Sequence, residues 1–296
     1  MSRNCPMRLV VKFNLVLLVI FVVGFGAAAA FSRSLLEQSA REDVLQDARL
    51  IMESALASRA YTINQVAPLL HKLGDDEFLP QTVPAFAATE QFDALHAKLP
   101  DFSYKEATLN PTNLRDRAAD WEVDIVNSFR RAPELTEIIG ERDTPLGRSL
   151  YLGRPIVIRD AACLSCHSTV EAAPRSMLQK YGPANGFGWR LNETIGAQLV
   201  SVPMTLPISR ANRALFTFLA FLGGIFLLVF VALNVMLRLI VVQRLTTLSQ
   251  VADEVSLGKI DGPDFPTSGR DEVSRLAQSF NRMKKSVAHA IKMLEE

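Results

Sequence analysis

The stretch FNLVLLVIFVVGFGAAAAF, residues 13–31, has Asn14 as its one polar side chain. Its length is close to the roughly 20 residues that a helix needs to cross the hydrocarbon core of a bilayer. Because no backbone polar group stays unpaired in lipid, such a stretch is expected to be helical. A second apolar stretch covers residues 214–237. The two stretches predict a pair of transmembrane helices that flank the central part of the chain.

Basic residues at the outer ends of these stretches indicate how the chain is oriented. Arg3, Arg8 and Lys12 precede the first stretch, and Arg238 and Arg244 follow the second. Since cytoplasmic flanks are rich in Lys and Arg, both termini are predicted to be cytoplasmic and the segment between the spans to be exported. A basic start and an apolar run are also typical of a secretory signal. The apolar run is long for a signal, so a retained anchor is preferred.

The chain of 296 residues is therefore expected to be a multi-pass protein of a bacterial inner membrane. A cytoplasmic tail, a transmembrane helix, a periplasmic domain, a second transmembrane helix and a cytoplasmic tail are expected at residues 1–12, 13–31, 32–213, 214–237 and 238–292. A formal net charge of +1 gives no indication of nucleic-acid binding. Of the three cysteines, Cys5 is interpreted as an idle thiol, with acylation as the alternative.

Periodicity in the exported segment predicts a mixed α+β domain. A long helix is expected to continue the first apolar stretch over Leu35–Lys72. Two shorter helices are expected at Glu90–Lys98 and Trp121–Arg131. Two β-rich stretches are Leu150–Ile158 and Gly196–Met204. Glycine, proline and asparagine predict loops at Asp75–Pro84 and Asn110–Asn113.

The segment Cys163-Leu164-Ser165-Cys166-His167 lies between the two β-rich stretches. The spacing Cys-x-x-Cys-His is the covalent attachment site of c-type haem. Two thiols at this spacing reach the two vinyl groups of the porphyrin, and the histidine that follows is held over the iron as an axial ligand. The sequence therefore predicts one haem c per chain, bound through Cys163, Cys166 and His167.

Two other chemistries use a Cys-x-x-Cys pair. A thiol–disulfide redox pair is expected in a thioredoxin-like strand–loop–helix context, and the sequence shows no βαβ pattern around the motif. A zinc site needs further ligands, and the exported segment has no second cysteine pair. Both interpretations are kept as alternatives to haem.

Residues near the motif are candidates for a haem pocket. Phe187 and Trp189 are candidates for its apolar wall, and Arg154 is a candidate partner of the propionates. Further candidates are Leu152, Ile156, Ile158, Met177, Arg175 and Arg190. The second axial ligand is open: His71 and His96 lie among charged residues, whereas Met52 and Met204 lie in stretches expected to be buried. A methionine ligand raises the reduction potential, and an open position favours a small gas ligand.

The exported segment resembles the PAS-like c-type haem sensor family, formerly a domain of unknown function and often N-terminal to HAMP domains in bacterial signalling proteins. The resemblance implies a PAS-like mixed α/β fold with His167 on the iron. Some relatives place a cysteine on the leading helix as second ligand. This chain has no cysteine between Phe13 and Ala162, so Met52 is the nearest substitute on that helix. The motifs are Tyr61-Thr62, Leu109–Asn113, Trp121-Glu122, Cys163–His167, Tyr181-Gly182, Gly186–Trp189 and Val202–Met204.

The cytoplasmic segment resembles a HAMP domain, a parallel dimeric four-helix bundle with two helices per chain. Its helices are expected at Val242–Leu257 and from Asp271-Glu272 onward, joined by a connector at Ile260–Gly269. Arg244 stands where the family commonly has a proline. The apolar seam residues, at helical spacing, are Leu245, Leu248, Val251, Val255, Val273, Leu276, Phe280, Met283 and Val287.

These features predict a membrane-bound sensor of redox state or a diatomic gas, and not an enzyme. The expected partners are a second copy through the HAMP tail, an unidentified cytoplasmic output protein and a small gas ligand. The rival hypothesis is a membrane-anchored c-type cytochrome in electron transfer, which explains the haem motif and the spans but gives the HAMP-like tail no role.

Overall fold

The computed structural model of the protein describes residues 9–73, 77–145, 147–259, 262–267 and 269–295. The chain divides into two compact units, one formed by Ser32–Leu215 and the other by Met1–Phe31 with Phe216–Glu296. Two helical stretches, Val10–Lys72 and Thr205–Ser256, are long and apolar enough to cross a membrane. The α+β class, with two long apolar helices around a small sheet domain, is confirmed. Cys5, Asp75 and Ile260 lie outside the described residues.

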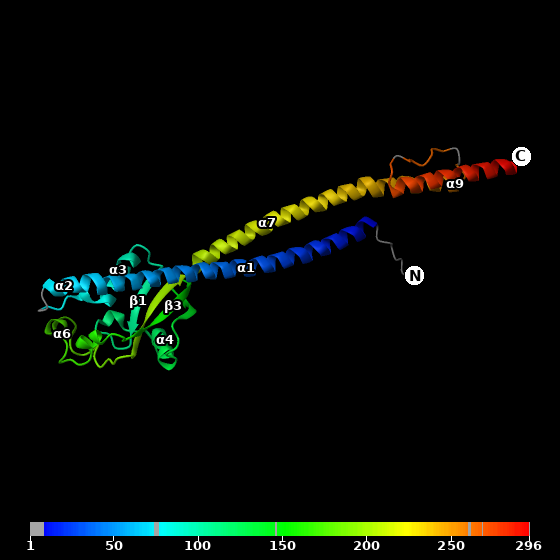
Figure 1. Ribbon diagram of the computed structural model, residues 1–296. Coiled ribbons are helices and arrows are strands. Elements are labelled where there is room, and N and C mark those ends of the chain that lie inside the picture. Colours follow the sequence, from blue (N-terminus) through cyan, green and yellow to red (C-terminus); the bar gives the residue numbers. More distant parts are fainter. Residues whose placement is uncertain (1–8, 74–76, 146, 260–261, 268, 296) are drawn as a thin grey trace. The chain divides into compact units, whose positions relative to one another are not determined.

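The helices and strands follow one another along the chain in a simple order (Figure 1). They are α1 (Leu9–Tyr61), η1 (Thr62–Val66), α2 (Ala67–Leu73), η2 (Pro80–Thr82), α3 (Pro84–His96), β1 (Ser103–Thr108), η3 (Leu114–Asp116), α4 (Asp120–Arg131), β2 (Ile138–Thr144), β3 (Gly147–Val157), η4 (Ala161–Cys163), α5 (Leu164–His167), α6 (Arg175–Tyr181), β4 (Thr194–Pro203), α7 (Thr205–Met236), η5 (Leu237–Val242), α8 (Gln243–Ser256) and α9 (Glu272–Glu295).

The predicted leading helix is confirmed, with a π-helical segment near its end. Helix α1 passes into η1, where the N–H of Ala67 donates to the carbonyl of Thr62. Pro68 follows directly and has no N–H to donate, so the regular pattern of i to i−4 bonds is already broken there. π-Helical segments of this kind are frequent at functional sites.

The sheet has four strands in the order β1-β4-β3-β2, and all three strand pairings are antiparallel. The sequence predicted β3 and β4 but not β1 and β2, whose sequences SYKEAT and IIGERDT are rich in charge. Two of these charges are satisfied across the layers, because Glu106 pairs with Arg59 and Lys105 pairs with Glu122. Helix α3 begins at Pro84 and not at Glu90, since proline suits the first position of a helix.

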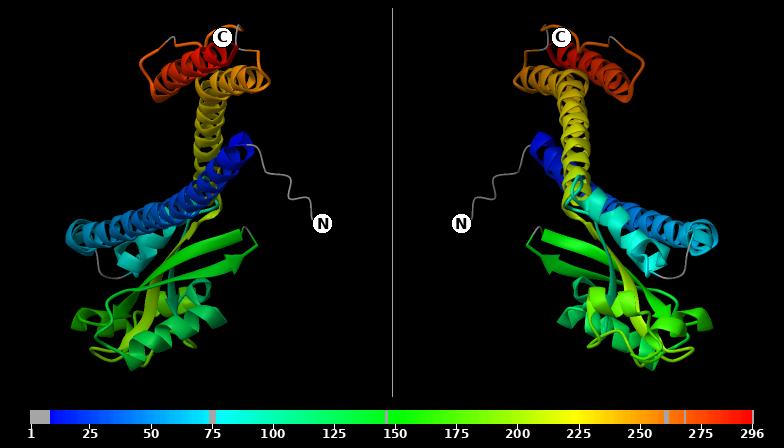
Figure 2. Two further views of the ribbon diagram at one scale, coloured as in Figure 1. Left: turned by 90° about the vertical axis from the view of Figure 1, so that its right-hand side faces the viewer. Right: turned by 90° about the vertical axis from the view of Figure 1, so that its left-hand side faces the viewer.

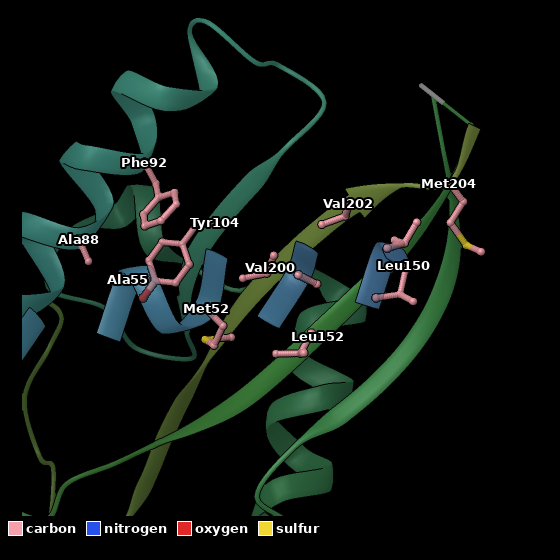
Figure 3. Packing of buried hydrophobic residues seen from close by; sticks show 12 residues of the cluster. Met52, Ala55, Ala88, Phe92, Tyr104, Leu150, Leu152, Val200, Val202 and Met204 are labelled. Carbon is pink, nitrogen blue, oxygen red and sulfur yellow. The ribbon is translucent and has the colours of Figure 1, made fainter. Parts of the chain in front are cut away.

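Each face of the sheet is covered by helices (Figure 2). On one face, α1 and α3 pack Met52 and Phe92 against the strands, and Figure 3 shows Met52 beside Leu152 and Val200. On the other face, α4 packs Phe129 against β4 and β1. Alternation along the strands explains the division, because successive side chains point to opposite faces. The first cluster comprises Val44, Ala48, Met52, Ala55, Ala88, Phe92, Tyr104, Leu150, Leu152, Val200, Val202 and Met204.

The C-terminal unit has the two helices predicted for a HAMP tail. Phe265 of the connector is buried, stacks on Phe280 at 5.2 Å, and is held by Asn281, whose side-chain amide bonds both the N–H and the carbonyl of Phe265. Asp271 caps α9 by accepting from the N–H of Ser274 and also pairs with Arg244 at 2.7 Å. The connector is therefore tied to both helices.

The predicted seam of the HAMP tail divides into two sets. Leu248 and Val251 are buried, and Val255, Val273 and Phe280 pack against them within the chain. The other members are exposed, namely Leu245, Leu276, Met283 and Val287. One chain therefore buries only part of the apolar surface that the sequence pattern predicts.

Candidate functional site

The Cys163–His167 motif lies on a short helical turn in the connection between β3 and β4. Asp160 starts the turn, because its carboxylate accepts from the N–H of Ala162 at 2.9 Å. Cys163 is exposed, Cys166 is half-buried, and both are free thiols. A helical turn places residues three and four apart on one side, so both cysteines and His167 share a face. This arrangement leaves the thiols accessible to a large group that approaches from solvent.

His167 is held by the segment that follows α6. Its Nδ1 lies 2.7 Å from the carbonyl oxygen of Gly186, and its ring stacks on Trp189 with 3.9 Å between centroids. Two backbone bonds join the same segments, from Gly188 to Ser168 and from Trp189 to His167. The imidazole therefore has one fixed orientation.

The loop that follows β1 supports this segment from the other side. Asn110 accepts from the N–H of Gly186 at 3.2 Å and donates to the carbonyl of Phe187. Thr112 places its Oγ1 at 3.4 Å from Nδ1 of His167. The turn predicted at Asn110–Asn113 is thus a clamp on the histidine loop.

The residues present fit a haem attached to this turn. A carbonyl oxygen only accepts, so Nδ1 of His167 carries the proton toward Gly186, and Nε2 keeps its lone pair for a metal. Burial lowers the pKa of His167 more than the bond to Gly186 raises it, which favours the neutral ring that ligates iron. The two free thiols are the other half of the attachment chemistry.

The alternatives to haem find less support around the motif. All ladders between the four strands are antiparallel, so the motif has no thioredoxin-like βαβ context. In the described part of the chain, no group of three or more His, Cys, Asp or Glu side chains is placed to hold a metal ion. A zinc ion at Cys163 and Cys166 would thus lack further protein ligands among the described residues.

The other predicted pocket residues lie at different distances from this turn. Trp189 contacts His167 directly, and Phe187 lines a neighbouring cavity of about 110 Å³. Arg154 is paired with Glu53 at 2.7 Å and with Glu137 at 3.2 Å, so its charge already has two carboxylate partners. Met52 is fully buried in the first cluster, with Met204. The roles of Arg154 and Met52 toward haem stay predictions.

Three charged residues near the site were missed by the sequence prediction. Arg59 and Glu106 form a bidentate pair at 2.6 and 2.5 Å, and the charge of Arg59 also acts on the thiol of Cys163. Burial raises the pKa of Asp116 to about 6, with Arg115 opposing and Glu106 reinforcing the change. The signal available in the sequence was the spacing of Arg59, which continues the buried stripe of α1.

Replacing Gly186 with alanine is expected to destabilise the protein more than the same change at Gly182. Both glycines have positive φ, which costs a non-glycine residue about 1–2 kcal/mol. At Gly186 a Cβ would also lie 2.9 Å from the Cα of Thr112, whereas nothing lies within 4 Å at Gly182. Urea unfolding of the full chain in detergent, followed by tryptophan fluorescence, measures the difference. Equal losses in the two variants would contradict the clamp.

Comparison with known proteins agrees with this geometry. The chain is similar to a solved structure described as the cyanobacterial heme-protein Tll0287, with 19% identity over 54% of this chain and 94% of that one, and a TM-score of 0.42. No curated protein matches the chain. The HAMP domain family matches residues 236–289, and the Tll0287-like family matches residues 37–203, more than half of the chain. The chain therefore belongs to the Tll0287-like family of haem proteins and carries a HAMP domain after that segment.

Proposed function

We propose that the protein is a membrane-bound sensor in which one covalently attached haem c reports redox state or a diatomic gas to the HAMP domain. The observation that carries the proposal is the preset His167, whose Nδ1 is bound to Gly186 and whose Nε2 is free, on the same turn as two free thiols. A HAMP domain in the same chain gives the site a relay. An electron-transfer cytochrome would need the haem but not the relay.

The chain's own residues perform the binding and the orientation. Cys163 and Cys166 hold the porphyrin through thioethers, His167 is the protein's axial ligand, and Trp189 keeps the imidazole plane in place. Arg154 and Phe187 are further candidates for contact with the haem, and Met52 for its second axial position. When bound, haem supplies an iron that changes charge by one unit on reduction and that takes a diatomic ligand at an open position.

The membrane assignment rests on two helical stretches with mean hydropathy of 2.6 and 2.8. Basic residues at their outer ends favour cytoplasmic termini and a periplasmic haem domain. The proposed parts are thus residues 1–12, 13–31, 32–213, 214–237 and 238–292, as tail, span, sensor, span and HAMP domain. Haem c attachment takes place on the outer side of such a membrane, which agrees with this orientation.

A second copy of the chain is expected to cover the exposed apolar face of α9. Leu276, Met283, Val287 and Ile291 are 44, 48, 39 and 39% exposed, and steps of seven and four place them on one side of the helix. Intervals of this kind are typical of helices that pack in coiled coils. The HAMP tail is therefore proposed to form a homodimer through this face.

Cross-linking tests the dimer. In a Cys5→Ser background, Val287→Cys in membrane vesicles is expected to give a covalent dimer with a short bismaleimide. Lys285→Cys is the control, because residues two apart on a helix point to nearly opposite sides. An equal yield of dimer at both positions would count against the proposed face.

The same variant tests the sensor function. The rate of cross-linking at Val287→Cys is measured with the haem oxidised, reduced, and reduced in the presence of carbon monoxide. A sensor must favour one packing of the HAMP bundle in one haem state, so at least one rate is expected to differ severalfold. Identical rates in all three states would reject signalling and leave electron transfer as the function.

A further inference from the structure

Helix α1 presents one stripe of side chains to the sheet, and Arg59 is part of it. Val44, Ala48, Met52 and Ala55 are fully buried, at steps of four, four and three. Arg59 comes four residues later, which puts it on the same face of the helix. Its side chain is 23% exposed. An arginine that continues an apolar stripe needs a partner in the layer below, since an unpaired buried charge is costly.

That partner is a carboxylate in the middle of the sheet. Glu106 of β1 is 5% exposed and receives both bonds from Nη1 of Arg59, at 2.6 and 2.5 Å. Tyr104 donates to the same carboxylate at 2.9 Å, and Gln198 donates to the hydroxyl of Tyr104 at 3.2 Å. Burial and the neighbouring Glu106 raise the pKa of Tyr104, so its hydroxyl stays a donor. Glu106 is thus a charged group whose bonds join α1, β1 and β4.

Both ends of this ion pair lead to the candidate haem site. Strand β1 runs from Glu106 into the loop where Asn110 and Thr112 hold the histidine segment. Arg59 lies close enough to Cys163 that its charge lowers the pKa of the thiol, against burial and Asp160, which raise it. One ion pair therefore touches the helix that leads to the first apolar span, the strand that supports His167, and the surroundings of a haem-bearing cysteine.

We propose that Arg59 and Glu106 are positioning residues that couple the haem to helix α1. The pair sets the local charge at the haem edge near Cys163, and the charge of the haem in turn changes how strongly Arg59 holds α1 on β1. This inference rests on the proposed function, because it names the contact through which a sensor haem would act on the leading helix. Reciprocity of coupling requires the pair to shift the haem if the haem is to shift the pair.

Other ion pairs on α1 lack this connection and serve as controls. Arg49 pairs with Glu137 of the loop before β2, and Arg41 pairs with Glu141 of β2, in both cases with an arginine more than half exposed. Exposed pairs of this kind contribute about 0–1 kcal/mol and are screened by salt. Arg49→Gln and Glu137→Gln therefore remove an α1-to-sheet pair while leaving the charge near Cys163 unchanged.

The first test is the midpoint reduction potential of the full chain with haem. A nearby positive charge disfavours the oxidised iron. Arg59→Gln is therefore expected to lower the potential, Glu106→Gln to raise it, and the double variant to return close to wild type. Arg59→Lys keeps the charge and is expected to stay near wild type, so it also controls for folding. Shifts of the same sign in both single variants, or shifts no larger than in the Arg49 and Glu137 controls, would overturn the proposal.

The second test needs no haem. In full-length protein from a host without cytochrome c maturation, alkylation of Cys163 at fixed pH is measured by mass spectrometry, with Cys166 as the internal reference. Arg59→Gln is expected to slow alkylation of Cys163 severalfold and Glu106→Gln to accelerate it. If these rates shift but the matured protein carries no haem, the proposed function fails and the charge pair stands. If haem is present and neither the rates nor the potentials shift, the coupling fails and the function stands.

Discussion

The double variant Cys163→Ala/Cys166→Ala is expected to lose all covalently bound haem when it is produced in a host competent in cytochrome c maturation. The wild-type chain should show a Soret band and keep its haem after denaturation, because two thioethers survive unfolding. The variant has no thiol near His167 to form either bond, since the chain contains only Cys5 besides these two. Absorption spectra and haem staining of a denaturing gel measure the loss.

Two controls make this result specific to the motif. Cys5→Ser should keep the full haem content, because Cys5 lies in a different part of the sequence. His167→Ala should keep covalent haem but change its spectrum, since the imidazole supplies a ligand and not a covalent link. If wild-type protein from the competent host has two titratable thiols at Cys163 and Cys166 and no Soret band, the haem assignment is wrong.

The parts of the fold that the sequence predicted are those with a strong local signal. The apolar stretch at residues 13–31 and the uncapped helical pattern after it give α1, and the regular apolar spacing gives the two HAMP helices. Strands β3 and β4 were visible because their cores are apolar runs, as in Leu199–Val202. The Cys-x-x-Cys-His motif was visible because chemistry fixes its spacing.

The parts that it missed depend on contacts between distant segments. Strand β1 carries Lys105 and Glu106, and only the arrival of Glu122 from α4 and Arg59 from α1 makes those charges acceptable in a central layer. The same holds at Gly186, whose carbonyl orients His167 across 19 residues of chain. Local patterns contain no information on which distant side chain will satisfy a buried charge.

The exposed half of the HAMP seam illustrates a different case. Leu276 and Phe280 follow one helical pattern, but only Phe280 is packed within the chain. A pattern of apolar residues shows that a face will be covered and does not show by which molecule. The structure of one chain separates the set buried by the chain itself from the set that the proposed second copy would bury.

Met52→Ala is expected to lower the free energy of unfolding by about 2–5 kcal/mol, the range for removing a large buried side chain from a core. Met52 has no exposed surface, and its neighbours Leu152 and Val200 belong to strands that cannot close the space without disturbing the sheet. Met52→Leu keeps the volume and should cost less than about 1.5 kcal/mol. Urea unfolding of the full chain in detergent compares the two variants.

The absorption spectra of these two variants also test the predicted iron ligand on α1. As a ligand, Met52 would supply a thioether that neither alanine nor leucine has, so both variants would show an altered Soret band and a lower reduction potential. As a packing residue only, Met52 could be replaced by leucine with no change in either. The side chain lies within the first cluster, so a ligand role also requires that it leave Leu152 and Val200 for the iron. Met52→Leu alone distinguishes the two roles, because it removes the sulfur while preserving the packing.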